Sequence, residues 1–188
     1  TWRTDPKLLT NGFRRIEVEY CDAQPNVIYA QYEDSLEPSY YSDLKGIFRS
    51  NDGGSTWTQL DNPAQSIGAS FAFPWYAFLL GVPHANPDFV GSGSVDMVYT
   101  ADGGNSWDYA NYSHADYHVA VFDKDNSSYY FVGNDGGLHL YDVNSTNFKS
   151  ISLNNGYNVT QFYAGAFFPN NIDANAGAQD NGTNYTQN

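Results

Sequence analysis

The feature that most constrains the fold of this chain is a phrase of eight residues that occurs twice, fifty residues apart. Residues 50–57 read SNDGGSTW and residues 100–107 read TADGGNSW, so both fit the pattern S/T-x-D-x-G-x-S/T-W. In such a phrase the aspartate accepts hydrogen bonds from backbone N–H groups, glycine takes a positive φ and tryptophan packs between neighbouring sheets. We therefore predict two β-hairpin turns whose structural residues are Ser50, Asp52, Gly54, Trp57, Thr100, Asp102, Gly104 and Trp107.

Weaker copies of the phrase extend the repetition along the chain. In residues 141–148 only the terminal aromatic residue of the phrase, Phe148, is present. The first two residues of the chain, Thr1-Trp2, match the last two residues of the phrase. The aromatic positions 2, 57, 107 and 148 are separated by intervals of 55, 50 and 41 residues. Repetition at this period is typical of stacked structural units.

Each repeat shows the same order of predicted strands. First strands are expected at 15–20, 75–82, 118–122 and 161–168, and second strands at 27–31, 89–93, 129–133 and 174–179, with turns rich in Pro and Asn between them. Short strands at this spacing with almost no helical periodicity predict an all-β fold, a β-propeller segment of about four blades with four-stranded antiparallel sheets. We expect residues 1–188 to form part of a single propeller domain, with blades at approximately 3–60, 61–110 and 111–153 and an incomplete blade at 154–188.

The two full phrases resemble the Asp-box, or bacterial neuraminidase repeat, of sialidases, sortilin-type propellers and xyloglucanase-like glycoside hydrolases. The segments HADYH (114–118), FVGNDGGLHLY (131–141), NVTQFY (158–163) and GAQDNGT (177–183) look like a run common in large secreted bacterial Asp-box proteins. The resemblance implies the fold more than an activity, because the Asp-box is architectural in families with different functions. Since three and a half blades cannot close a propeller, we expect the remaining blades of a parent chain, or a completing subunit, as partners.

The charge of the chain excludes several classes of partner. Eight Lys and Arg face 21 Asp and Glu, a net charge of −13, which disfavours nucleic acid and anionic membrane surfaces. No apolar run is long enough to span a bilayer, so we expect no membrane insertion. Aromatic residues make up 17% of the chain, enough for a substantial core.

Twenty Asn, only eight Lys and Arg, and the sequons given below favour an extracellular or cell-surface location. The single cysteine, Cys21, excludes an internal disulfide framework and a zinc ribbon. Six N-x-S/T sequons are present, at Asn111, Asn126, Asn144, Asn158, Asn181 and Asn184. No calcium loop, phosphate-binding loop or dinucleotide fingerprint occurs, so we assign no cofactor and no metal.

Propeller geometry indicates where a ligand would bind. The entries into the first strands and the loops between second and third strands share one rim, whereas the two hairpins lie on the opposite side. The predicted ligand-binding rim consists of Arg14, Arg15, Trp75, Tyr76, His114, Asp116, His118, Asn134, Asp135, Gln161, Gln179 and Asp180. Its aromatic side chains, and Tyr40-Tyr41 in the insertion at 33–45, could stack on sugar rings while the polar side chains bond hydroxyl groups.

The His-x-Asp-x-His pattern at 114–118 allows two interpretations. If the segment is extended, His114, Asp116 and His118 share one face and could hold a divalent ion or form an acid–base pair. The alternative is that these side chains tie the third blade to the second through hydrogen bonds.

The candidate catalytic residues are Asp135 and Asp180, which recur 45 residues apart in similar turns. Two carboxylates on one rim would suit glycoside hydrolysis, although Asp and Gly also simply favour tight turns. Xyloglucanase-like enzymes carry their catalytic aspartate in a D-x-G-G turn. When the two glycines are superposed, this chain has Asn134 at the position of that aspartate, and Asp135 follows one residue later. We therefore expect a secreted or cell-surface scaffold for glycan or protein binding and adhesion; the alternative is part of a glycoside hydrolase that uses rim aspartates.

Overall fold

The computed structural model describes residues 5, 7–35, 44–126, 128–145, 148–157, 160–169 and 173–186. Thr1-Trp2, Tyr40-Tyr41 and the sequon asparagine Asn158, which entered the sequence predictions, lie outside these residues. The chain divides into two compact units, Thr1–Leu153 and Asn154–Asn188, and each is described by itself.

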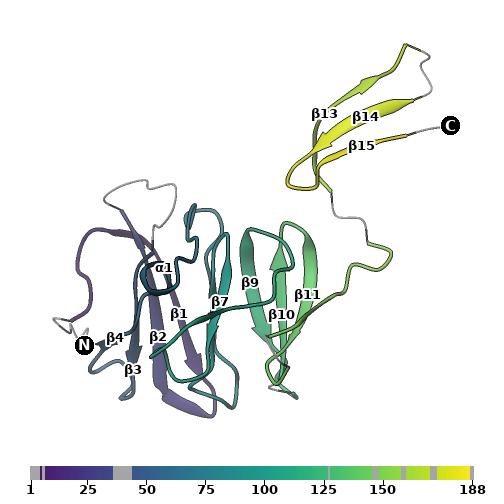
Figure 1. Cartoon of the computed structure of the whole chain (residues 1–188). Coiled ribbons are helices and arrows are strands. Elements are labelled where there is room, and N and C mark those ends of the chain that lie inside the picture. The colour runs from purple at the N-terminus through teal and green to yellow at the C-terminus, as the bar shows by residue number, and fades with distance from the viewer. Residues whose placement is uncertain are drawn as a thin grey trace. The chain divides into compact units, whose positions relative to one another are not determined.

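The first unit contains three antiparallel sheets of four strands, and the strands of each sheet pair in chain order (Figure 1). The strands are β1 (Phe13–Cys21), β2 (Gln24–Asp34), β3 (Leu44–Ser50) and β4 (Thr58–Gln59); β5 (Leu79–Gly81), β6 (Val90–Gly93), β7 (Met97–Thr100) and β8 (Asp108–Tyr109); and β9 (Tyr117–Phe122), β10 (Tyr129–Asn134), β11 (Gly137–Asp142) and β12 (Ser150–Ser152). One short helix, α1 (Pro63–Ser66), precedes the second sheet. The all-β prediction of antiparallel four-stranded sheets is confirmed.

The second unit is a three-stranded antiparallel sheet. Its strands are β13 (Phe162–Phe167), β14 (Ala174–Ala178) and β15 (Thr183–Tyr185), again paired in chain order. That the four sheets belong to one domain with the blade limits given above stays a prediction. Among the described residues of both units, no helix has the length and apolar character needed to cross a membrane.

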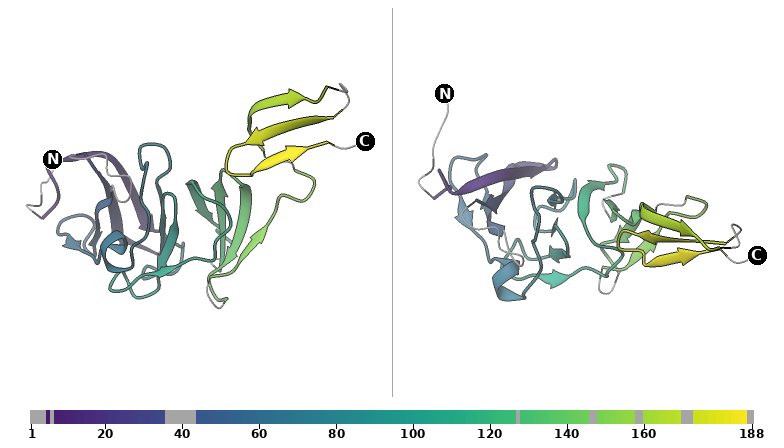
Figure 2. Two further views of the ribbon diagram at one scale, coloured as in Figure 1. Left: turned by 45° about the horizontal axis from the view of Figure 1, so that its top comes forward. Right: turned by 90° about the horizontal axis from the view of Figure 1, so that it is seen from above.

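Within the first unit the three first strands are neighbours, with β5 between β1 and β9 (Figure 2). Alternate side chains of β1 and β9 point away from the core, because Val18, Val119 and Val121 are each more than half exposed, whereas Cys21 and Tyr117 are buried. The first strands therefore line one side of the unit, and the later strands of each sheet lie progressively farther from it.

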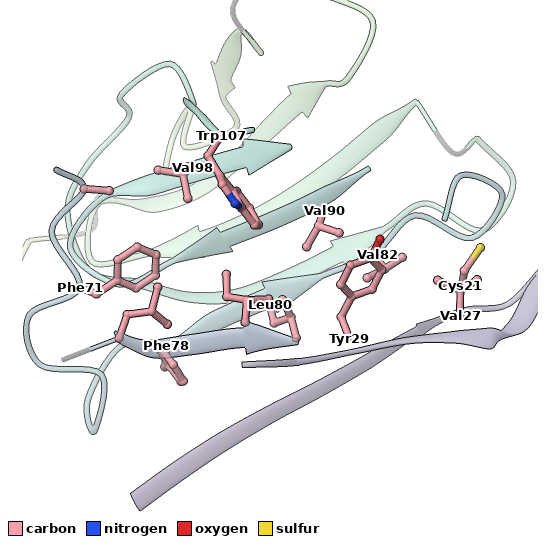
Figure 3. Packing of buried hydrophobic residues seen from close by; sticks show 13 residues of the cluster. Cys21, Val27, Tyr29, Phe71, Phe78, Leu80, Val82, Val90, Val98 and Trp107 are labelled. Carbon is pink, nitrogen blue, oxygen red and sulfur yellow. The ribbon is translucent and has the colours of Figure 1, made fainter. Parts of the chain in front are cut away.

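The first and second sheets are held together by an apolar core that Figure 3 shows from close by. Tyr29 of β2 is fully buried in this cluster, which also contains Val90 of β6 and Val98 of β7. The hydroxyl of Tyr29 donates to the carbonyl of Pro87 at 2.7 Å, so the polar end of this buried ring is also satisfied. Burial at this interface raises the pKa of Tyr29.

The second and third sheets share a core that is mostly aromatic. Tyr130 of β10 stacks on Phe122 of β9 with ring centroids 4.1 Å apart, and Phe148 packs against both Tyr130 and Phe89. Phe148 is the terminal aromatic of the eroded third phrase and is 1% exposed. The terminal aromatic of this phrase is therefore a core residue, as Trp57 and Trp107 are.

The first phrase forms the hairpin between β3 and β4. The Ser50 hydroxyl donates to the Asp52 carboxylate at 2.9 Å and accepts from the N–H of Gly54 at 2.8 Å. The same oxygen, Oδ1, accepts from the backbone N–H of Thr56 at 2.8 Å, and Oδ2 accepts from the Thr56 hydroxyl at 2.7 Å. Gly54 has a φ of 86°, a conformation that favours glycine.

The second phrase forms the hairpin between β7 and β8 with the same bonds. Thr100 donates to Asp102 at 2.7 Å and accepts from the N–H of Gly104 at 3.0 Å, while Ser106 donates to Asp102 through its N–H and hydroxyl. Trp107 is buried in the core between the first two sheets and donates its indole N–H to the carbonyl of Asp61 at 3.0 Å. The Ser/Thr and Asp side chains and the Gly backbone therefore make equivalent hydrogen bonds in the two phrases, whereas the indole of Trp57 donates to the carbonyl of Gly54.

These two carboxylates lead us to expect a loss of stability in acid. Hydrogen bonds from Thr56 lower the pKa of Asp52 to about 2, and hydrogen bonds from Ser106 lower the pKa of Asp102 to about 2, against 3.8 for an ordinary aspartate. Because the folded-state pKa lies below the unfolded one, the stabilisation is complete above about pH 4 and is lost as the pH falls towards about 2. The melting temperature measured over this interval should fall, and it should fall less steeply in the Asp52→Asn, Asp102→Asn double variant. An equal slope in both proteins would contradict the assignment.

One predicted strand is wrong in length. The first strand of the second sheet was expected at 75–82, but β5 covers only Leu79–Gly81. Pro74 lacks a backbone N–H, and the N–H groups of Tyr76 and Ala77 both donate to the carbonyl of Phe73, at 2.8 and 3.0 Å. The segment before Leu79 therefore forms a turn instead of joining the sheet.

Candidate functional site

The loop of residues 73–78, which leads from α1 into β5, presents three aromatic side chains to solvent. Phe73, Trp75 and Tyr76 are 40%, 62% and 42% exposed. The rings of Phe73 and Trp75 meet edge to face at 6.4 Å between centroids, and those of Trp75 and Tyr76 lie 5.8 Å apart. Adjacent exposed rings of this kind mark surfaces that contact other molecules.

Arg15, on β1 of the neighbouring sheet, fixes the shape of this loop. Its guanidinium donates to the carbonyls of Pro74 at 3.2 Å, Phe78 at 3.3 Å and Tyr76 at 3.5 Å. Its Nε donates to Glu17 at 2.7 Å, which orients the guanidinium plane. A charged donor that satisfies several carbonyls of one loop holds that loop against the sheet.

The turn itself is strained at Phe73. This residue has a φ of 59°, a left-handed conformation that costs a residue with a Cβ about 1–2 kcal/mol. The surrounding bonds maintain it, and strain held in this way is typical of binding loops.

Asp135, in the turn between β10 and β11, connects the loop to the third sheet. Its carboxylate accepts from the hydroxyl of Tyr76, at 3.1 and 3.3 Å to the two oxygens, and one oxygen lies 2.7 Å from Nε2 of His118. The ring of Tyr76 also meets that of His118 edge to face at 4.7 Å. With Asp135 ionised, His118 carries its proton on Nε2 and donates it to the carboxylate. The structure thus brings Trp75, Tyr76, His118 and Asp135 together, and we refer to these four residues as the rim site.

Asp116 adds a second carboxylate next to the rim site. A carboxylate oxygen of Asp116 lies within 4.8 Å of one of Asp135. Asp116 has a φ of 64° and β9 begins only at Tyr117, so the segment 114–118 is not extended throughout. The alternation expected for His114, Asp116 and His118 therefore does not apply. Two carboxylates of this unit could approach one cation, but the described residues here give us no ground to assign a metal.

Asn134 lies beneath the rim site rather than on its surface. It is 8% exposed. Its amide group donates to the Ser113 hydroxyl at 2.8 Å and to the carbonyl of His114 at 3.2 Å, and its oxygen accepts from the N–H of Gly136 at 3.0 Å. The side chain of Asn134 therefore stabilises the turn that carries Asp135, and its amide group forms hydrogen bonds with other groups of the protein.

The other predicted rim residues, Gln161, Gln179 and Asp180, lie in the second unit. The N–H of Gln179 donates to the carbonyl of Gln161 at 2.9 Å, and the hydroxyl of Tyr163 donates to the side chain of Gln179 at 2.7 Å. Asp180 is exposed, in the turn between β14 and β15, which corresponds in strand order to the turn of Asp135. The convergence of Asp135 and Asp180 stays a prediction.

The sequence places Arg15 on the predicted rim but does not reveal that it holds the loop 73–78, and it gives no indication that Phe73 belongs to this surface. Arg15 acts through contacts with a loop about sixty residues away, which no local pattern indicates. The position of Phe73 could have been inferred from Pro74, since proline within an expected strand indicates a break.

The sequence matches no protein-family model and no curated protein. In structure the chain is similar to an ancestral GH74 enzyme, with a TM-score of 0.50 and 14% identity over 94% of this chain and 24% of that chain. It is also similar to the GH74 enzyme of Niastella koreensis, with a TM-score of 0.53 and 16% identity over 87% of this chain and 26% of that chain. These likenesses support a β-propeller fold, and the chain spans about a quarter of the length of the structures it resembles.

Proposed function

We propose that this chain is a segment of an Asp-box propeller that acts as a binding scaffold for glycans. The observation that carries the proposal is the exposed pair Trp75 and Tyr76, held by Arg15 beside the polar pair His118 and Asp135. The face of an aromatic ring packs against the C–H face of a pyranose, while carboxylate and imidazole groups bond its hydroxyls. The rim site supplies both kinds of contact on one surface.

The Asp-box assignment is supported by the two hairpins, in which Asp52 and Asp102 accept equivalent hydrogen bonds. The sequons, the twenty Asn and the small number of Lys and Arg favour a secreted or cell-surface protein, and the proposal includes a role in adhesion there. The net charge of −13 disfavours polyanionic ligands.

Affinity for glycans should depend on Trp75. Trp75→Ala is expected to weaken binding about tenfold, since loss of ring stacking costs roughly 1 kcal/mol or somewhat more. Isothermal titration against neutral oligosaccharides selected on a glycan array would measure the change. Tyr109→Ala is the matched control, because Tyr109 is exposed on β8 in the same unit but outside the rim site. Equal affinity of both variants and the parent chain would overturn the proposal.

A second candidate function is hydrolysis of a glycosidic bond, and it is favoured by the proximity of the Asp116 and Asp135 carboxylates. Paired carboxylates can divide the roles of acid and base or nucleophile. The experiment is an assay for released reducing ends on every glycan that binds. If the chain hydrolyses a glycan, Asp135→Asn should abolish turnover; if it is a scaffold, the same variant should only weaken binding.

A further inference from the structure

Two imidazole nitrogens of the third sheet are buried without a hydrogen-bond partner. Among the described residues, neither Nε2 of His114 nor Nε2 of His139 forms a hydrogen bond. His139, on β11, is only 6% exposed. A buried polar atom without a partner costs free energy, so its presence in a core calls for an explanation.

The segment of residues 111–114, which we call the covering segment, lies over the face of the sheet that bears His139. Tyr141 is two residues from His139 on β11 and therefore points to the same face. The residue paired with His139 stands two positions before Asn134 on β10, so Asn134 points to this face as well. The Ser113 hydroxyl is hydrogen-bonded to both, at 2.9 Å to the Tyr141 hydroxyl and 2.8 Å to the Asn134 amide. The covering segment is thus attached to the sheet through the residues that flank His139.

His114 connects the covering segment to the turn of the rim site. A Cβ atom at Gly136, the residue after Asp135, would lie 2.5 Å from the Cβ atom of His114, so this side chain packs directly on the turn. Nδ1 of His114 lies 3.2 Å from the carbonyl oxygen of Ala115, and since a carbonyl only accepts, Nδ1 carries the proton of the neutral ring. The carbonyl of His114 accepts from Asn134, which stabilises the same turn. Movement of the covering segment would therefore remove support from the turn of Asp135.

The surroundings of His139 favour its neutral form. Burial, and then the charge of His114, lower the pKa of His139. Asp135 accepts from Tyr76 on the rim, and Nε2 of His139 has no carboxylate partner among the described residues. The titratable groups of the elements packed around this face are Asp96, Asp116, Tyr117, Asp135 and Tyr141.

We propose that the rim site contains a pH switch, in which His139 takes up a proton in mild acid, the covering segment lifts and the turn of Asp135 is released. A charged imidazole needs hydrogen bonds that its buried position lacks, and water supplies them once the segment has lifted. The switch rests on the proposed function where it concerns glycan binding, whereas the opening of the segment does not.

The direction of the pH dependence follows from the neutral state of His139 in the closed form. Its pKa there is lowered below the value of about 6.5 for a free histidine. The closed form is therefore fully favoured above about pH 6.5, and each pH unit below this value favours the open form by up to about tenfold until His139 also titrates in the closed form. This interval lies well above the acid range in which Asp52 and Asp102 titrate.

The test is hydrogen exchange of the full chain, followed by NMR between pH 7.5 and 5.5 and corrected at each pH for the intrinsic exchange rate. The N–H of Gly136 donates to the side chain of Asn134 at 3.0 Å and reports on the turn, whereas the N–H of Gly104 donates to Thr100 in a hairpin. Protection of Gly136 should fall by up to about tenfold per pH unit below about pH 6.5, while that of Gly104 stays constant. Constant protection of Gly136 in the parent chain would overturn the proposal.

Two variants of His139 identify the titrating group. His139→Phe and His139→Gln should each make the protection of Gly136 independent of pH, and circular dichroism verifies that each variant folds. His84→Gln is the matched control and should keep the pH dependence, because His84 is exposed in the segment after β5. The same fall in protection in the parent chain and in a folded His139 variant would contradict the switch.

Glycan binding separates the switch from the proposed function. A glycan that binds at pH 7.5 should bind several-fold more weakly at pH 5.5, and the change should be smaller in His139→Phe. If the loss of affinity is equal in both proteins, the switch at His139 is wrong although the glycan site stands. If no glycan binds at either pH, the proposed function fails, and the exchange of Gly136 still decides the switch.

Discussion

Replacing Trp107 with alanine is expected to remove about 3–5 kcal/mol from the free energy of unfolding, the cost typical of deleting a large buried aromatic. Trp107 is 4% exposed in the core between the first two sheets, and the substitution also leaves the carbonyl of Asp61 without its indole donor. Trp57, 8% exposed beside β2 and β3, is expected to behave in the same way. Denaturant unfolding of each variant would measure the loss.

Trp75→Ala is the matched control for these variants. Trp75 is 62% exposed, so its removal should change the free energy of unfolding by less than about 0.5 kcal/mol, while the hairpin variants should leave the rim site intact in the protein that remains folded. The opposite pattern, with stable hairpin variants and an unstable Trp75→Ala, would show that the hairpin tryptophans are not structural.

The hairpins could be predicted from the sequence because their determinants are local. Asp52 and its partners Ser50 and Thr56 all lie within seven consecutive residues, and the same spacing recurs at Asp102. Because the hydrogen-bond partners of each aspartate lie within the repeated motif, the hairpin can be predicted without knowledge of the rest of the fold. The order of strands within each sheet could be predicted from the same repeat.

The rim site was predicted only in part, because its geometry depends on contacts between sheets. Tyr76 reaches Asp135 across 59 positions in the sequence, and Arg15 reaches Tyr76 across 61. The sequence pattern placed these residues on one rim but assumed a continuous strand before Leu79 and an extended segment at Asp116. Instead, Phe73 and Asp116 each have a positive φ. Phenylalanine gives no sign of this conformation, and aspartate, although enriched in it, adopts it too rarely for it to be predicted from the sequence.

A second large effect on stability is expected where the second and third sheets meet. Gly81 of β5 and Gly91 of β6 are paired across the sheet, and both lie against the ring of Tyr130 from β10. A Cβ atom at Gly91 would lie 2.6 Å from the hydroxyl oxygen of Tyr130, and one at Gly81 would lie 2.5 Å from it. Tyr130 is fully buried and stacked on Phe122, so it cannot move aside easily. Gly91→Ala should therefore cost about 1–3 kcal/mol or more through overpacking.

Tyr130→Phe provides a way to separate this steric effect from a change in backbone freedom. The hydroxyl of Tyr130 is buried and has no hydrogen-bond partner among the described residues, so its removal should be neutral or should stabilise the fold by up to about 1 kcal/mol. It also removes the atom closest to the new methyl group, so Gly91→Ala should cost less in the Tyr130→Phe background than in the parent chain. A double-mutant cycle measured by thermal unfolding gives the coupling directly. If Gly91→Ala costs the same in both backgrounds, the close packing of this ring against the two glycines is not what requires them, and the contact between the second and third sheets must rest on the surrounding aromatic residues instead.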